Sequence, residues 1–94
     1  MTVTKFVWHP EKAVSNLAKH GVSFEQASGV FDDPRALYEI DFEHGERREL
    51  VLGMSADSQV LYVVFIEFDR ENTIRIISAR EATKRERRAY EQGD

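Results

Sequence analysis

The sequence predicts an α+β fold, in which an N-terminal strand and a helical hairpin pack on an antiparallel sheet of four to five strands and a C-terminal helix follows. Apolar residues recur at helical spacing between residues 10 and 32, whereas residues 36–80 contain four strand-like segments separated by short polar turns. Such segregation of helices from strands is typical of α+β proteins. At 94 residues the chain is expected to form one domain, residues 1–94.

The N-terminal segment predicts a strand followed by a first helix. Residues 3–8 are mostly apolar, and Pro10 stands where a helix can begin. Gly21 is a natural left-handed terminator, so we expect the helix to span about Pro10 to His20.

A second helix is expected directly after this glycine. Ser23 and Gln26 have the spacing of a capping box, in which the serine hydroxyl accepts from the Gln26 amide while the Gln26 side chain reaches back. Pro34 ends the pattern, since it disfavours helix in the residue before it. The hairpin should pack three residues on the sheet: Leu17, Phe24 and Ala27.

Four strands and a final helix complete the chain. The strands are expected at residues 36–42, 47–55, 59–68 and 73–80, and the helix at residues 81–92. Residues 60–66 are apolar on both faces of the expected strand, so this strand should be central in the sheet.

Pairing across the first tight turn predicts which face the hairpin covers. If Met54 pairs with Val60, then Leu50, Leu52 and Met54 share an apolar face, which we expect the hairpin to cover. The opposite face then aligns Glu49 with Phe65.

The last hairpin decides where Arg75 points. A three-residue loop at residues 69–71 pairs Ile66 with Ile74 and directs Arg75 to the face that carries Phe65. A loop one residue longer would turn Arg75 to the other face, among the aliphatic residues. We favour the shorter loop, because it buries Ile74 and leaves the cation in water.

Charge is distributed unevenly along the chain. The net charge is -4, yet residues 70–90 hold seven cations and three carboxylates. This basic segment could bind phosphates, or it could pair with carboxylates elsewhere in the chain.

Composition excludes several classes of function. The absence of cysteine excludes a disulfide framework, a thiolate nucleophile and a zinc ribbon. His9, His20 and His44 lack metal-ligand spacing, and no glycine-rich phosphate loop is present, so no metal or nucleotide cofactor is indicated. The N-terminal residues lack an apolar run long enough for a signal peptide or a membrane span, so a cytoplasmic protein is expected.

Five segments together resemble one known family, the BrnT toxins. The resemblance spans nearly the whole chain in the expected order, and the ordered set is specific although each segment alone is weak. The segments are Phe6–Ala13 (FVWHPEKA), Asn16–Ala27 (NLAKHGVSFEQA), Gly45–Arg48 (GERR), Ile74–Ala82 (IRIISAREA) and Glu86–Tyr90 (ERRAY).

The resemblance implies a bacterial type II toxin with a fold similar to the RelE ribonucleases, which cleaves RNA without a metal and blocks translation. It also implies a BrnA-like antitoxin with a ribbon-helix-helix DNA-binding domain, joined in a two-plus-two complex that represses its own operon. His9 stands where the family often has Asp, and either residue could cap the following helix.

Metal-free RNA cleavage needs a cation that neutralises charge on the phosphoryl oxygens, and the planar arginine fork suits this task. Arg75 and Arg47 are the first candidates, because the favoured register places both on one face, and Arg80 follows at the strand exit. For Arg75, a surface ion pair with Glu49 or Glu67 is the structural alternative.

The general base is harder to assign. Glu49 could accept a proton weakly between its neighbouring arginines. Lys19 and His20 could serve only if the helical joint folds over the sheet rim. The structural alternative for His20 is a hydrogen bond to free carbonyls in the last helical turn.

Five residues are candidates for RNA binding: Arg48, Lys84, Arg85, Arg88 and Tyr90. Arg48 could instead cover the rim of the apolar face, and Tyr90 could be a packing residue. The basic final helix could be a solvated helix, a phosphate-binding face, or the docking surface of an acidic antitoxin segment. The competing function is a non-enzymatic interaction module that uses the same sheet face and final helix.

Overall fold

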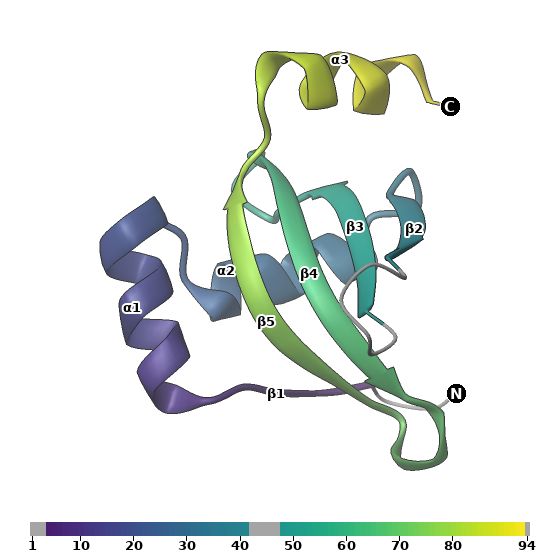
Figure 1. The fold of residues 1–94 in the computed structure, drawn as a ribbon. Coiled ribbons are helices and arrows are strands. Elements are labelled where there is room, and N and C mark those ends of the chain that lie inside the picture. Colours follow the sequence, from purple (N-terminus) through teal and green to yellow (C-terminus); the bar gives the residue numbers. More distant parts are fainter. Residues whose placement is uncertain (1–3, 42–47, 94) are drawn as a thin grey trace.

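The computed structural model describes residues 4–41 and 48–93, and it confirms the α+β class and the predicted order of elements (Figure 1). Its helices are α1 (Pro10–His20), α2 (Phe24–Ser28) and α3 (Lys84–Gln92), with 3-10 turns at Gly29–Asp32 and Asp69–Glu71. Its strands are β1 (Lys5–Val7), β2 (Leu37–Asp41), β3 (Arg48–Met54), β4 (Val60–Phe68) and β5 (Thr73–Glu81). No helix in the described part is long and apolar enough to cross a membrane.

The five strands form one sheet in the order β1-β5-β4-β3-β2, with β4 in the centre as predicted. Strands β2 to β5 are antiparallel, but β1 runs parallel to β5, so the sheet is mixed rather than antiparallel throughout. Parallel pairing is possible here because β1 and β5 are joined by the long connection that contains the helices and the other strands.

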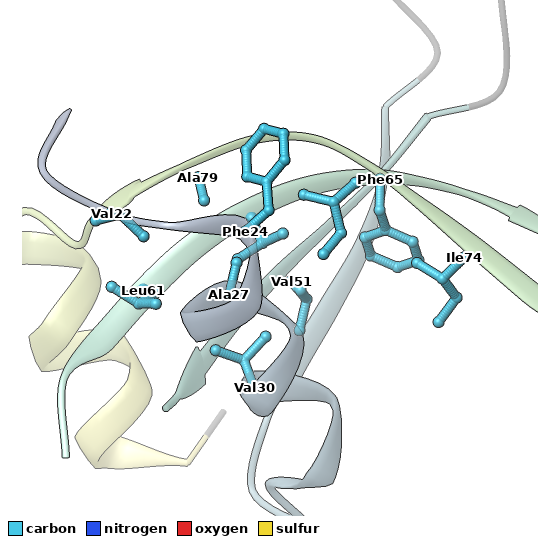
Figure 2. Packing of buried hydrophobic residues seen from close by; sticks show 11 residues of the cluster. Val22, Phe24, Ala27, Val30, Val51, Leu61, Phe65, Ile74 and Ala79 are labelled. Carbon is cyan, nitrogen blue, oxygen red and sulfur yellow. The ribbon is translucent and has the colours of Figure 1, made fainter. Parts of the chain in front are cut away.

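The helical hairpin covers one face of the sheet and forms the core with it (Figure 2). Phe24 and Ala27 of α2 are fully buried against strand residues such as Val51, Val63 and Phe65. The predicted pairing of Met54 with Val60 is confirmed.

The predicted covered face, however, is wrong, because the hairpin lies on the face opposite to Leu50 and Leu52. Both faces of β3 and β4 are apolar, so alternation in the sequence did not distinguish them. Gly53 does distinguish them, since a Cβ built there would lie 3.1 Å from the Val30 Cβ. The hairpin therefore approaches the sheet where a side chain is missing.

Helix α1 is held to the sheet by a polar residue. The expected contact residue Leu17 is 51% exposed, whereas the next residue toward the N-terminus, Asn16, is 7% exposed. The Asn16 amide nitrogen donates to the backbone oxygens of Ala79 (2.8 Å) and Val22 (3.0 Å), and its oxygen accepts from the Ala79 amide (3.1 Å). Beyond the end of β1, Asn16 thus satisfies the edge of β5 as a neighbouring strand would.

The helix ends show which capping predictions hold. Gly21 ends α1 with φ of 70°, as predicted. Ser23 accepts from the Gln26 amide as predicted. The Gln26 side chain, however, donates to Asp57 and Gln59, so the prediction that it reaches back to complete the capping box is wrong. Gln26 instead joins α2 to the β3–β4 turn.

Candidate functional site

The hairpin between β4 and β5 differs from the predicted register. Phe68 pairs with Thr73, so the connection is one residue longer than expected, and Arg75 pairs with Ile66. Arg75 therefore lies on the sheet face opposite to Phe65, and the prediction that it shares a face with Glu49 is wrong. Ile74 is nevertheless buried, because the hairpin covers the face that was expected to be polar.

A β-bulge in β5 brings two arginines to the same face. Phe65 pairs with Ile76 and Val64 with Ser78, which leaves Ile77 as the extra residue. An odd sequence interval separates Arg75 from Arg80, and a regular strand would place them on opposite faces. The bulge corrects this parity, so both arginines lie on the face not covered by the hairpin, here called the open face.

Arg80 is held in place from two sides. Its guanidinium donates to both Glu86 carboxylate oxygens, at 2.8 and 2.9 Å, and its Cζ lies 4.1 Å from the ring centre of Tyr62. This bidentate bond lowers the pKa of Glu86 and raises that of Arg80, so both stay charged. Burial raises the pKa of the Tyr62 hydroxyl, which stays neutral. Charge on Arg80 is therefore largely compensated.

Glu86 also begins the final helix. Thr83 accepts from the Glu86 amide (3.1 Å), and the Glu86 carboxylate accepts from the Thr83 amide (2.9 Å), which is a complete capping box. Sequence reasoning missed both Glu86 and Tyr62. The Thr-x-x-Glu spacing before a helical segment was the available signal for Glu86, while no sequence signal indicated Tyr62.

Tyr90 fixes the other end of α3. It is 3% exposed, and its hydroxyl donates to the Asp33 carboxylate, which also accepts from the Met54 amide. Burial favours a higher pKa for Asp33, but these hydrogen bonds and one from the Arg35 amide outweigh it and hold the pKa low. Tyr90 packs in this position, so its ring is not available to stack on a base.

Between α3 and the open face lies a groove of about 500 Å³. Leu37, Leu50 and Leu52 form much of its floor, and Arg85 and Glu86 line it from α3. The predicted RNA-binding residues of this helix, Lys84, Arg85 and Arg88, are all exposed.

The other candidate residues are dispersed. Arg75 is exposed, and its Cζ lies 5.6 Å from the ring centre of Phe68. Glu49 lines a separate hollow with Asp32 and Glu67 on the hairpin side of the sheet. Arg48 is half-buried and lies opposite Asp41 in the register between β3 and β2.

Lys19 and His20 are exposed in the last turn of α1. Arg47 and His44 lie outside the described residues. Within residues 4–41 and 48–93, no three His, Asp or Glu side chains gather as metal ligands.

Comparisons with known proteins show which family and which fold this chain resembles. A family model described as "Ribonuclease toxin, BrnT, of type II toxin-antitoxin system" matches residues 8–86. The fold is similar to the crystal structure of the Brucella abortus ribonuclease toxin, BrnT, with a TM-score of 0.64 and 20% identity, covering 87% of this chain and 100% of that one. No curated protein sequence gives a significant match.

Proposed function

Because the chain belongs to the BrnT family of ribonuclease toxins of type II toxin-antitoxin systems, we propose that it cleaves RNA without a metal ion and thereby inhibits translation. A cytoplasmic location follows from this role. The similarity to RelE ribonucleases that the sequence implies is part of the same proposal.

The observation that carries the chemistry is the presence of Arg75 and Arg80 on the open face of one strand. In metal-free cleavage the 2′-oxygen loses its proton and bonds to the adjacent phosphorus, while the bond from phosphorus to the 5′-oxygen breaks and that oxygen takes up a proton. Charge develops on the phosphoryl oxygens during this exchange. Arg75 is exposed, and within the described residues it contacts an aromatic ring rather than a carboxylate, so its fork is available to bind two oxygens. We therefore assign the charge-stabilising role to Arg75.

Arg80 has a different role in this proposal. Its charge is compensated by Glu86, and the pair joins β5 to α3. It is a positioning residue that fixes the basic helix beside the open face. Glu49 faces the other side of the sheet, so it does not act with Arg75 in this proposal.

Family membership gives the toxin an antitoxin partner. We propose that this partner is BrnA-like, has a ribbon-helix-helix DNA-binding domain, and forms a two-plus-two complex with the toxin. The groove between α3 and the open face is a suitable position for one of its segments, because it combines an apolar floor with charged residues from α3 and from β2. A neighbouring reading frame with a ribbon-helix-helix pattern would support the proposal, and the mass of the copurified complex tests its composition.

The test of the catalytic proposal is RNA cleavage by the purified chain in the presence of a chelator. Wild type should cleave, and Arg75→Ala should lose about 10²- to 10³-fold in rate, the usual cost of removing one donor to the developing charge. Arg70→Ala is the matched control, since it removes the same charge from an exposed position in the turn of the same hairpin.

Three outcomes separate the alternatives. Loss of activity in Arg75→Ala, with an unchanged circular dichroism spectrum and normal activity in Arg70→Ala, supports the assignment. Equal activity of the two variants contradicts the role of Arg75. A wild-type chain that leaves RNA intact with and without divalent metal, yet binds its antitoxin, would instead favour the non-enzymatic interaction module.

A further inference from the structure

The parallel pairing of β1 with β5 brings two distant segments of the chain to one small hollow. Val7 and Arg75 are neighbours on the two strands, and the chain leaves β1 through His9 into α1. The hollow, of about 270 Å³, is lined by Trp8, His9, Lys12 and Arg75 among others. We call it the cationic hollow.

The charge of the cationic hollow distinguishes it from the other hollows of the described chain. Its charged or titratable lining residues are His9, Lys12 and Arg75, and no described carboxylate lines it. The groove under α3 contains both signs of charge, and the hollow around Glu49 contains carboxylates and no described cation. Clustered cations without carboxylates repel one another, and a bound anion would remove this cost.

Pro10 lines the hollow and begins α1, but two other residues of the hollow, His9 and Lys12, do not add to the stability of this helix. Lys12 occupies the first turn, where the helix dipole disfavours a cation and favours an anion. His9 is the N-cap residue, yet its side chain makes no capping hydrogen bond, so the expected cap is wrong. Two suboptimal choices at one helix end, facing one arginine, indicate a function rather than a structural role.

The walls of the hollow are rigid. Trp8 packs edge-on against the fully buried Phe24, with ring centres 5.9 Å apart. Ile76 is 1% exposed, and Ile77, the extra residue of the β-bulge, also lines the hollow. These walls fix the backbone positions from which His9, Lys12 and Arg75 extend, and all three side chains are exposed to a ligand arriving from solvent.

We propose that the cationic hollow binds a backbone phosphate of RNA, with Lys12 and His9 completing a phosphate subsite around Arg75. Lys12 supplies a point charge, Arg75 a bidentate fork, and the His9 ring a further donor. A single-stranded backbone fits this assignment, because it presents phosphates while Trp8 offers an apolar surface beside them. This inference rests on the proposed ribonuclease function and names residues that hold its substrate.

The test measures binding separately from cleavage. The probe is a 2′-O-methyl RNA oligonucleotide, which lacks the attacking hydroxyl, and fluorescence anisotropy gives its affinity for the full chain over a range of salt concentrations. Lys12→Gln should weaken binding about tenfold and reduce the slope of log affinity against log salt by about 0.7, the value for one phosphate contact on a single strand. Lys12→Arg should restore most of the affinity and most of the salt slope.

Lys5→Gln is the matched control, because it removes the same charge from an exposed position on β1. It should leave affinity and slope near the wild-type values. His9→Gln should weaken binding less than Lys12→Gln, and amide resonances of residues around the hollow should shift when the probe is added to wild type. Unfolding midpoints confirm that each variant is folded.

The result that overturns the inference is equal affinity and salt slope for Lys12→Gln and Lys5→Gln. Failure to bind the probe at all would overturn it too. If wild type binds the probe with the predicted dependence on Lys12 but does not cleave unmodified RNA, the subsite stands and the proposed catalytic function fails. If wild type cleaves RNA while Lys12→Gln binds normally, the function stands and the subsite fails.

Discussion

Replacement of Asn16 by alanine should weaken the attachment of α1 to the sheet and lower the free energy of unfolding. The side chain makes three hydrogen bonds at 2.8, 3.0 and 3.1 Å, and the variant leaves the Ala79 amide, the Ala79 oxygen and the Val22 oxygen without their partner. Each unsatisfied buried group costs about 1–3 kcal/mol. Taking about 1 kcal/mol for each of the three groups, we expect a gross loss of about 3 kcal/mol.

Helix propensity acts in the opposite direction. Alanine is a better helix former than asparagine by about 0.6 kcal/mol, so the net loss in the free energy of unfolding should be about 2.4 kcal/mol. In a domain of this size that corresponds to a decrease in Tm of about 10–19 °C.

Urea unfolding followed by circular dichroism measures the effect, with Ser15→Ala as the control. Ser15 is exposed on the same helix, so its replacement should be neutral or slightly stabilising. A loss below about 0.5 kcal/mol in Asn16→Ala would show that the two hydrogen bonds to Ala79 and the one to Val22 do not hold α1 in place.

Three further predictions concern packing and charge. Gly53→Ala should cost about 1–3 kcal/mol in urea unfolding, because its Cβ would lie 3.1 Å from a core side chain, whereas Gly29→Ala, with its nearest contact at 3.4 Å, should be close to neutral. Tyr90→Phe should cost about 1.5 kcal/mol by the same assay, since it loses a hydrogen bond to the half-buried Asp33 carboxylate, which water can partly solvate in the variant; an unchanged midpoint contradicts this. The bond from Arg80 lowers the pKa of Glu86 below its ordinary value of 4.5, so its stabilisation is present above that pH and is lost as pH falls through the folded value. Glu86→Gln should therefore lose less stability than wild type between neutral pH and pH values below 4.5, and equal losses would contradict the pairing.

Local chemistry accounts for what the sequence predicted correctly. Pro10 and Gly21 mark the two ends of α1 because each acts through its own backbone geometry. The pairing of Met54 with Val60 follows from the short turn between them. None of these features depends on which other parts of the chain pack nearby, so they can be derived from adjacent residues alone.

Long-range packing accounts for the two errors at the site. The covered face depended on where a helix could approach the sheet, and only Gly53 indicated it. The face of Arg75 depended on the length of a turn. That of Arg80 depended on a bulge, of which the run Ile76-Ile77-Ser78 carries no sequence mark. Because the covered face and the turn length were both predicted wrongly, Ile74 and Ile76 are still buried as expected. Arg75, however, does not share a face with Glu49.

Strand β5 is the element on which stability and the proposed chemistry meet. It is held by β1 at Arg75, by Asn16 at Ala79 and by the Glu86 bond at Arg80, so three separate attachments set the positions of its two arginines. A variant that weakens an attachment should lose activity together with stability. Arg75→Ala should lose activity alone, because this side chain is exposed and supports no buried contact. Plotting cleavage rate against the free energy of unfolding for these variants therefore separates residues that position the site from the residue that acts on the phosphate.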